Sequence, residues 1–218
     1  MLLVLDTSSS RGCCALAGDD GELLACSSWS AAQGHAEQLL PHLVAMLEQR
    51  GVTLATLAGV VVDVGPGSFT GVRAAVATAK ALSLAPCLPV VAIDALAALA
   101  MTDRSPRSRV ALLDAHRGDL FVAVHAPDGE RVMPPSLVPI LEISRVLDAH
   151  PGAALVGARD VLVSIGRAGS SPDDDQRLAS LARLGAARHA RGQVDDAAAL
   201  EPLYVRPPDL SLPRAKRV

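Results

Sequence analysis

The stretch VVDVGPGSFTGVRAAVATAKAL, residues 61–82, is highly informative about the fold. An apolar, β-branched run ends at Gly65, a glycine-rich turn continues to Gly71, and an alanine-rich helical pattern follows over 70–84. A continuous β-branched run is typical of a strand covered on both faces, and glycines let the chain turn sharply into a helix. The stretch therefore predicts a strand, turn and helix unit of a layered α/β protein.

The glycine-rich turn raises the question of whether it binds phosphate. It lacks the lysine of a Walker A loop, and Thr70 stands where a dinucleotide fingerprint has its third glycine. Even so, Ser68 or Thr70 can cap the helix, its first N–H groups carry partial positive charge, and Arg73 adds a cation. The alternative is structural, because glycines also let a helix lie close to a strand. The residues alone leave both interpretations open.

Polar residues also end the first apolar run, LLVLD at 2–6, where Asp6 is followed by Thr7 and Ser8. In a two-lobed ATPase, a carboxylate at a strand end lies near a metal-bound phosphate. In an ordinary hairpin, the same aspartate makes an Asx turn, and the residues favour this reading. If a weak, degenerate nucleotide site exists here, its residues are Asp6, Thr7, Ser8, Gly65, Gly67 and Ser68.

The rest of the pattern divides the chain into two lobes. Residues 1–103 contain a hairpin turn at 19–21, a helix over 33–50, and strands and helices that alternate to residue 101. Residues 104–218 open with three strands and continue with a helix over 140–150, a loose loop over 166–177, a helix over 178–192 and an irregular tail. Two tandem α/β lobes predict the actin-like, ribonuclease-H-like (ASKHA) ATPase fold.

Composition and charge exclude several classes of protein. Half of the 218 residues are apolar and the formal net charge is -3, which argues against a general polyanion binder. We expect the short basic tail with Arg214, Lys216 and Arg217 to be solvated. The four cysteines lie in apolar stretches without a C-x-x-C pair, so we expect buried thiols and a reducing, cytoplasmic compartment. No run of about 20 apolar residues predicts a membrane span, and we do not expect the short, uncharged N-terminal run to be a signal peptide.

Candidate catalytic and metal-binding residues form no convincing set. His35 and His42 lie seven residues apart on the first predicted helix, without an obvious third ligand. Asp114, His116 and Asp119 are more typical of a turn between strands than of a metal site. No nucleophile elbow, H-E-x-x-H or C-x-x-C motif occurs. We therefore expect no catalytic residues, no metal and no cofactor.

Five motifs occur in one order along the chain: LDTSS at 5–9, HAEQLLPHL at 35–43, GPGSFTGVR at 65–73, DAHRGDLFVAVH at 114–125 and EPLYVRPP at 201–208. Together they resemble the TsaB (YeaZ) family of bacterial tRNA threonylcarbamoyladenosine biosynthesis, and GPGSFTGVR is highly specific for it. The resemblance is dense over residues 1–126 and returns at 201–208, whereas residues 140–200 carry little of it.

The resemblance implies a two-lobed actin-like fold without catalytic competence, in a non-catalytic relative of the transferase TsaD. Such proteins pair with TsaD through the helices that here span 33–50 and 70–84, and the ATPase TsaE joins them. The complex acts on tRNA, with direct contact to this chain left open, and a homodimer of the chain alone is a further expectation. The alanines of 70–84 permit close helix approach. The expected interface residues are His35, Leu39, Leu43, Arg73, Ala74 and Ala77.

Two other functions remain as alternatives. An ATP-dependent phosphotransferase of the actin-like superfamily rests on LDTSS and the glycine-rich turn. Against it, LVGARD at 155–160 stands where the family commonly has a glycine-richer loop, which disfavours a nucleotide between the lobes. A peptidase is the third reading, and no nucleophile or metal set in the sequence supports it.

Overall fold

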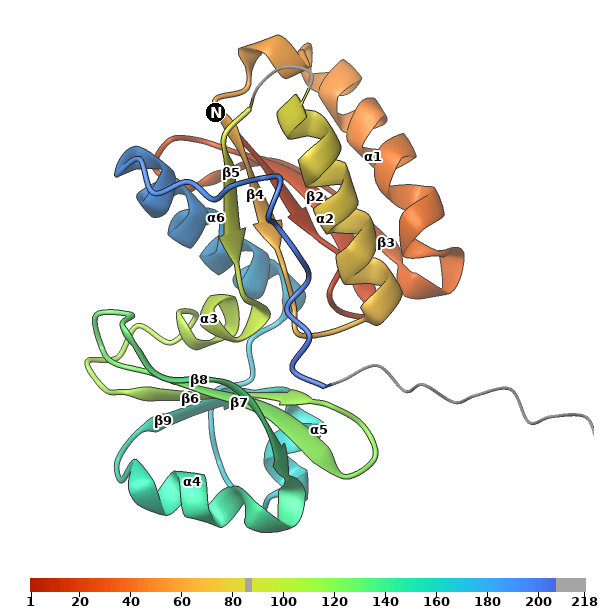
Figure 1. Cartoon of the computed structure of the whole chain (residues 1–218). Coiled ribbons are helices and arrows are strands. Elements are labelled where there is room, and N and C mark those ends of the chain that lie inside the picture. The colour runs from red at the N-terminus through yellow and green to blue at the C-terminus, as the bar shows by residue number, and fades with distance from the viewer. Residues whose placement is uncertain (85–87, 207–218) are drawn as a thin grey trace, which may run out of the picture.

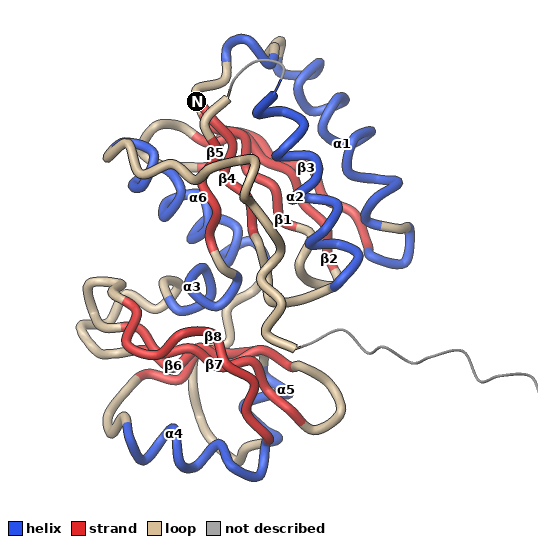
Figure 2. Tube along the Cα trace, in the orientation of Figure 1, coloured by secondary structure: helices blue, strands red, loops and turns tan. Residues whose placement is uncertain are grey.

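The computed structural model describes residues 1–84 and 88–206 and contains two β-sheets, each flanked by helices (Figure 1, Figure 2). The first sheet has the strand order β3-β2-β1-β4-β5. Its strands are β1 (Leu2–Asp6), β2 (Arg11–Ala17), β3 (Leu23–Ser30), β4 (Gly59–Asp63) and β5 (Val90–Ile93). The pairs β1–β2 and β2–β3 are antiparallel, whereas β1–β4 and β4–β5 are parallel. Because β1 and β4 are parallel neighbours, they end at the same edge of the sheet.

Helices cover both faces of the first sheet. They are α1 (His35–Arg50) and α2 (Phe69–Leu84) on one face, and α3 (Ala95–Ala100) and α6 (Asp174–Ala190) on the other. Alternation along β1 explains the two layers, because successive side chains of a strand point to opposite faces. Leu3 and Leu5 belong to the core beneath α1 and α2, and Leu2 and Val4 belong to the core beneath α6.

The second sheet has the order β8-β7-β6-β9, with only β6–β9 parallel. Its strands are β6 (Arg109–Asp114), β7 (Asp119–His125), β8 (Arg131–Pro139) and β9 (Ala154–Gly157). Leu96 and Leu99 of α3 pack on one face of this sheet, so α3 lies between the two sheets (Figure 1). The opposite face packs against α4 (Ile143–Ala149) and α5 (Arg159–Ser164). Short 3-10 helices occur at η1 (Ala31–Gln33), η2 (Leu54–Thr56) and η3 (Ile140–Glu142).

One predicted segment is corrected. Residues 166–177 were expected to form a loose loop, but α6 begins at Asp174. A capping box starts the helix: the Asp173 carboxylate accepts from the Gln176 N–H at 2.8 Å, and the Gln176 side chain accepts from the Asp173 N–H at 2.9 Å. The lobe boundary between residues 103 and 104 stays a proposal. Although α6 follows that boundary in sequence, it packs against the first sheet.

The cysteines need a second correction. Cys13 and Cys14 are buried as expected, but Cys26 is exposed because it lies on β3, an edge strand. Cys87 and the basic tail with its three prolines fall outside the described residues. Within residues 1–84 and 88–206, no helix has the length and apolar character needed to cross a membrane.

Candidate functional site

Two carboxylates end neighbouring parallel strands of the first sheet. Asp6 is the last residue of β1 and Asp63 is the last residue of β4, with Leu5 beside Val62 in the register. Both aspartates are buried, at 2% and 0% exposure. Buried carboxylates in one site repel each other unless a cation or a proton compensates their charge.

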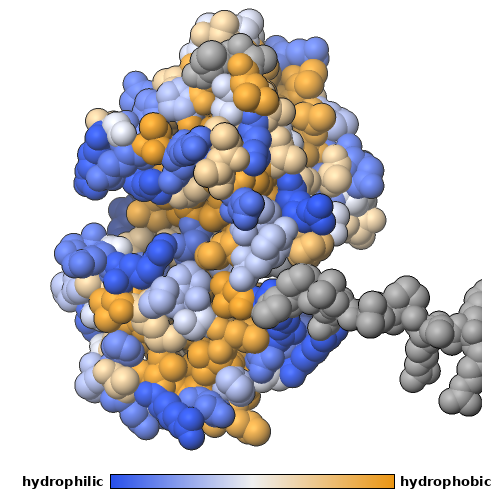
Figure 3. Space-filling view, in the orientation of Figure 1, coloured by the Kyte–Doolittle hydropathy of each residue, from blue (hydrophilic) through white to orange (hydrophobic). Residues whose placement is uncertain are grey.

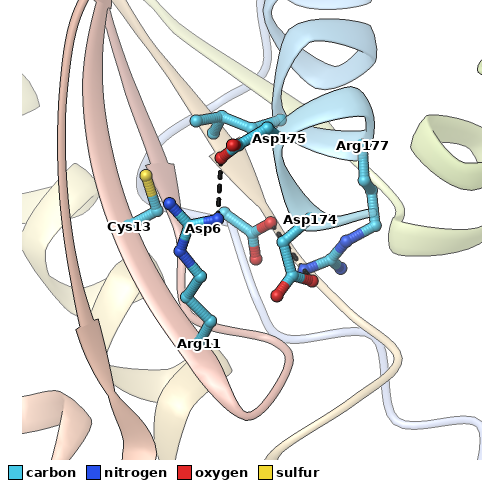
Figure 4. Close-up of a pocket in the computed structure, with 7 residues that line it drawn as sticks. Asp6, Arg11, Cys13, Asp174, Asp175 and Arg177 are labelled. Carbon is cyan, nitrogen blue, oxygen red and sulfur yellow. Dashed lines mark hydrogen bonds and ion pairs between the residues drawn. The ribbon is translucent and has the colours of Figure 1, made fainter. Parts of the chain in front are cut away.

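Arg177 of α6 supplies the cation (Figure 4). Its Nη2 lies 2.9 Å from Oδ2 of Asp6, and its Nη1 lies 3.6 Å from Oδ2 of Asp63. Asp174, one turn earlier on α6, lies 3.8 Å from Nη2. Arg177 is itself only 6% exposed. The chain therefore closes this cluster of charges with its own side chain.

Ser8 links the three charged groups. Its hydroxyl accepts a hydrogen bond from Nη1 of Arg177 at 2.8 Å and lies 2.9 Å from Oδ1 of Asp6 and 2.8 Å from Oδ2 of Asp63. One hydroxyl proton serves only one carboxylate, so a proton on the other satisfies both contacts. Burial, and then the charge of Asp6, raise the pKa of Asp63 to about 8. Asp63 is therefore the carboxyl that carries the additional proton near neutral pH.

A cavity of about 10 Å³ lies beside this cluster, as Figure 4 shows. Its lining combines buried Asp6 and Arg177 with the more exposed Arg11, Asp174 and Asp175. Arg11 and Asp175 form an ion pair of 2.7 Å on the exposed side. This volume is enough for about one water molecule.

Two N–H groups of the glycine-rich turn donate hydrogen bonds within the protein. The N–H of Ser68 donates to the Ser8 carbonyl at 2.7 Å, and the N–H of Gly65 donates to Oδ1 of Asp63 at 2.7 Å. Ser68 caps α2 by accepting from the N–H of Gly71 at 3.3 Å. A Cβ on Gly67 would overlap the Ser8 carbonyl. The turn therefore fastens the start of α2 to the end of β1.

Gly71 makes a second close approach, to Thr7. The Thr7 hydroxyl donates to the Gly71 carbonyl at 2.7 Å, and a Cβ on Gly71 would overlap the Thr7 carbonyl oxygen. These contacts favour the structural interpretation of the glycines over the phosphate-binding one.

A second candidate site is the outer face of α1 and α2, on the other side of these helices from the sheet. Leu40 and Val44 of α1 are 53% and 50% exposed, and Phe69 at the start of α2 is 50% exposed. The Arg73 guanidinium lies over the Phe69 ring at 5.2 Å, and Tyr204 lies beside that ring at 5.4 Å. Figure 3 shows apolar residues among polar ones at the surface where these helices lie. The face is thus a mixed apolar and cationic surface.

Half of the predicted interface residues are corrected. His35, Leu39 and Leu43 are buried rather than outward, because they recur at helical spacing on the side of α1 that faces the sheet. His35 Nε2 lies 2.9 Å from the Ser9 carbonyl oxygen. The other half behaves as expected in exposure: Arg73 and Ala77 are exposed and Ala74 is partly exposed.

Comparison with known proteins places the chain in a family. The model of the family TsaD, tRNA N6-adenosine threonylcarbamoyltransferase, matches residues 29–153. An uncharacterised protein of Mycobacterium tuberculosis is 31% identical, over 82% of this chain and 78% of its own. The tRNA threonylcarbamoyladenosine biosynthesis protein TsaB of Bacillus subtilis is 27% identical over 80% of both chains. YeaZ from Pseudomonas aeruginosa superposes with a TM-score of 0.73 at 27% identity, covering 93% of this chain and 98% of its own. The chain belongs to the TsaB (YeaZ) family.

More distant solved structures confirm the predicted fold of this TsaB-family chain. The ethanolamine utilization protein EutJ of Carboxydothermus hydrogenoformans has a TM-score of 0.52 at 14% identity, covering 84% of this chain and 89% of its own. At that identity the likeness concerns the fold alone. The two-lobed actin-like, ribonuclease-H-like architecture is therefore confirmed.

The actin-like fold implies a nucleotide and its metal ion, and the residues present do not fit them. The structure does bring the six predicted nucleotide-site residues together where β1 and β4 end. However, Arg177 already forms ion pairs with the carboxylates of Asp6 and Asp63, and the Ser68 N–H already donates to the Ser8 carbonyl. The adjacent cavity has a volume of only about 10 Å³. A divalent cation at Asp6 and Asp63 would face a buried guanidinium at hydrogen-bond distance.

Arg177 is a residue of this cluster that no sequence pattern indicated. It lies in the segment expected to be a loose loop, and the spacing of Asp173 and Gln176 was the signal that a helix begins there. Within the described residues, no three histidine, cysteine, aspartate or glutamate side chains gather as a metal site. His35 and His42 have different partners and do not form a shared site. Nδ1 of His42 lies 2.8 Å from the Ser27 hydroxyl, whereas Nε2 of His35 contacts the Ser9 carbonyl.

Proposed function

We propose that this chain is a non-catalytic subunit for threonylcarbamoyladenosine modification of tRNA, and that it binds and activates the transferase TsaD together with the ATPase TsaE. The observation that carries the proposal is the outer face of α1 and α2, where Leu40 and Val44 are half exposed beside an alanine-rich helix. Relatives named as tRNA threonylcarbamoyladenosine biosynthesis proteins supply the process.

Two features support a helical partner at this face. Ala77 and Ala81 of α2 are exposed, and small side chains let another helix approach closely. The family model of the transferase matches residues 29–153, a range that includes both α1 and α2. A transferase that shares this fold can present an equivalent helix pair, so the two proteins would meet about a pseudo-twofold axis. The same surface would serve a homodimer when the partner is absent.

Substitutions on the outer face test the contact. Val44→Glu and Leu40→Glu introduce charge at exposed positions, and we expect the dissociation constant for TsaD to rise more than about tenfold, or 1.4 kcal/mol. The matched control is Leu141→Glu, which changes an equally apolar residue that is 93% exposed and lies after β8 in the second sheet. Sedimentation of labelled chain with TsaD measures the affinities. If all three variants bound TsaD with equal affinity, the outer face of α1 and α2 would not be the contact surface.

Reconstitution tests the function itself. Unmodified tRNA is incubated with TsaD, TsaE, ATP and threonylcarbamoyl-adenylate, with or without the chain, and nucleosides are assayed by mass spectrometry. We expect modified adenosine only with the chain present, and a reduced yield with Val44→Glu that a higher concentration of that variant restores. A yield that does not depend on the chain would contradict the proposed role.

The ATP-dependent phosphotransferase remains the alternative, and the Arg177 contacts disfavour it. Calorimetry with ATP and Mg²⁺ separates the two functions. We expect no heat of binding for the unaltered chain. If the unaltered chain bound ATP and Asp6→Asn did not, the phosphotransferase would become the favoured function. No arrangement of described side chains favours the peptidase.

A further inference from the structure

Two cysteines lie on the same face of the first sheet, on neighbouring strands. Cys13 of β2 is opposite Ser28, and Cys26 of β3 is opposite Ala15, so the cysteines are diagonal neighbours across an antiparallel pair. Their Sγ atoms are 3.0 Å apart. Because a disulfide bond is about 2.05 Å long, the two sulfurs need to approach by only about 1 Å.

The two thiols have unequal environments. Cys13 is buried in the core beneath α6, whereas Cys26 is exposed at the edge strand. The hydrogen bond with Cys13 lowers the pKa of Cys26 to about 7 against the opposing effect of burial, and Arg11 lowers it further. The same hydrogen bond, with burial, raises the pKa of Cys13. An exposed thiolate next to a buried thiol is the arrangement of a redox-reactive cysteine and its resolving partner.

Arg11 is held in place beside this pair. Its Nη2 donates to the Ser28 hydroxyl at 3.0 Å, and its Nη1 pairs with Asp175 at 2.7 Å. The neighbouring Cys14 is on the opposite face of β2, where it is buried in the core beneath α1 and α2. Geometry therefore separates Cys14 from the pair.

We propose that Cys26 and Cys13 form a redox site, in which hydrogen peroxide oxidises Cys26 and Cys13 resolves the product to an intramolecular disulfide. The Cys26 thiolate attacks one peroxide oxygen, the O–O bond breaks, and sulfenic acid and hydroxide form. The Cys13 sulfur then attacks the Cys26 sulfur. The S–O bond breaks, the departing hydroxide takes the Cys13 proton, and water leaves. The hydroxide of the first step takes up the proton that the Cys26 thiol released when it ionised, so in sum two thiols and one peroxide give one disulfide and two waters. This inference is independent of the proposed function.

Peptide mapping of the full chain tests the proposal. The background is Cys87→Ser, so that the thiol outside the described residues does not contribute. After peroxide treatment and alkylation of remaining thiols, cleavage before Asp19 and Asp20 separates the two cysteines into different peptides. We expect a linked pair, lighter by two hydrogen atoms than the free peptides, that fragments to Cys13–Cys26 and that dithiothreitol separates. Unlinked peptides, or a Cys14–Cys26 link, would overturn the proposal.

Variants assign the two roles. In Cys13→Ser, dimedone should trap a sulfenic acid at Cys26, and in Cys26→Ser neither the disulfide nor the dimedone adduct should form. Cys14→Ser is the matched control and should give the Cys13–Cys26 link unchanged. In the unoxidised chain near neutral pH, iodoacetamide should label Cys26 more than about tenfold faster than Cys13, because the thiolate is the reactive form. Equal labelling rates for Cys13 and Cys26 would contradict the assignment. This test uses the unsubstituted cysteine pair, so it remains valid even if Cys13→Ser prevents folding.

Discussion

Arg177 is a residue whose loss leaves two buried carboxyl groups without the cation that contacts them. Asp6 and Asp63 lie at 2.9 Å and 3.6 Å from its guanidinium, and all three side chains are buried. The exposed pair of Arg11 and Asp175 offers the opposite case, since solvent screens it. The same kind of ion pair therefore has different consequences at two positions about one cavity.

Replacing each arginine tests that difference. We expect Arg177→Met to lower the free energy of unfolding by about 3–5 kcal/mol, because it strands buried charge. Arg11→Met should change it by less than about 1 kcal/mol. Urea denaturation of both variants measures the two values. Similar losses would mean that the buried cluster contributes no more than a surface pair.

The proton on Asp63 predicts a pH dependence. The folded-state pKa rises from 3.8 to about 8, so the folded chain binds this proton more tightly than the unfolded chain. The resulting stability is complete below pH 3.8 and is lost as the pH rises through about 8. We expect Asp63→Asn, which keeps a donor toward Ser8, to flatten this decline in urea denaturation between about pH 5 and about pH 9. Asp175→Asn is the exposed control and should retain it.

Gly71 carries a steric prediction. A methyl group there would overlap the Thr7 carbonyl, so we expect Gly71→Ala to lower the free energy of unfolding by about 1–3 kcal/mol. Gly51→Asn is the control, because Gly51 has a φ of 61° with nothing within 4 Å of its Cβ position, and asparagine tolerates that conformation. Thermal denaturation compares the two. An unchanged melting temperature for Gly71→Ala would show that α2 moves away from β1 at little cost.

Most helices and strands follow from the local sequence. Hydrophobic periodicity and turn residues predicted β1, the β2–β3 hairpin, α1, β4 and α2 in their observed order. Periodicity alone did not establish which face of α1 is buried, since Leu39 and Leu40 are equally apolar in sequence. The sheet beneath the helix decides this, and its position depends on residues far away in the chain.

Two adjacent residues of α1 test this orientation. Leu43 is buried in the core and Val44 is half exposed. We expect Leu43→Glu to abolish cooperative unfolding, because a buried unpaired carboxylate adds to the lost packing, at a cost above about 4 kcal/mol. Val44→Glu should stay within about 0.5 kcal/mol of the parent chain. Circular dichroism during urea denaturation measures the free energy of unfolding of both variants. A stably folded Leu43→Glu variant would mean that this side of α1 does not face the sheet.

The contact between α6 and the first sheet joins two distant parts of the chain, and no sequence pattern predicts it. The helix itself was expected, but its partner is a sheet whose last strand, β5, ends at Ile93. No local pattern encodes that pairing. The candidate site was predicted only in part for the same reason, because Asp6 and the glycine-rich turn are near each other through β1 and β4, whereas Arg177 arrives with α6.

Nested truncations test this dependence. A chain ending at residue 172 contains all strands of the first sheet but lacks α6, so we expect it to lose cooperative unfolding. A chain ending at residue 206 keeps every described contact, and we expect it to unfold at the same urea concentration as the full chain. Nuclear magnetic resonance spectra of both would show whether the first sheet is formed. Dispersed signals from the shorter chain would contradict the expectation.

The position of Arg177 late in the chain also affects synthesis. A ribosome adds about 5–20 residues each second, and Arg177 follows Asp63 by roughly 110 residues. Arg177 is therefore synthesised on the order of ten seconds after Asp63. During that interval the nascent chain has Asp6 and Asp63 but no guanidinium between them. The packing of α6 on the first sheet is therefore completed late in translation, although the strands of that sheet are synthesised first.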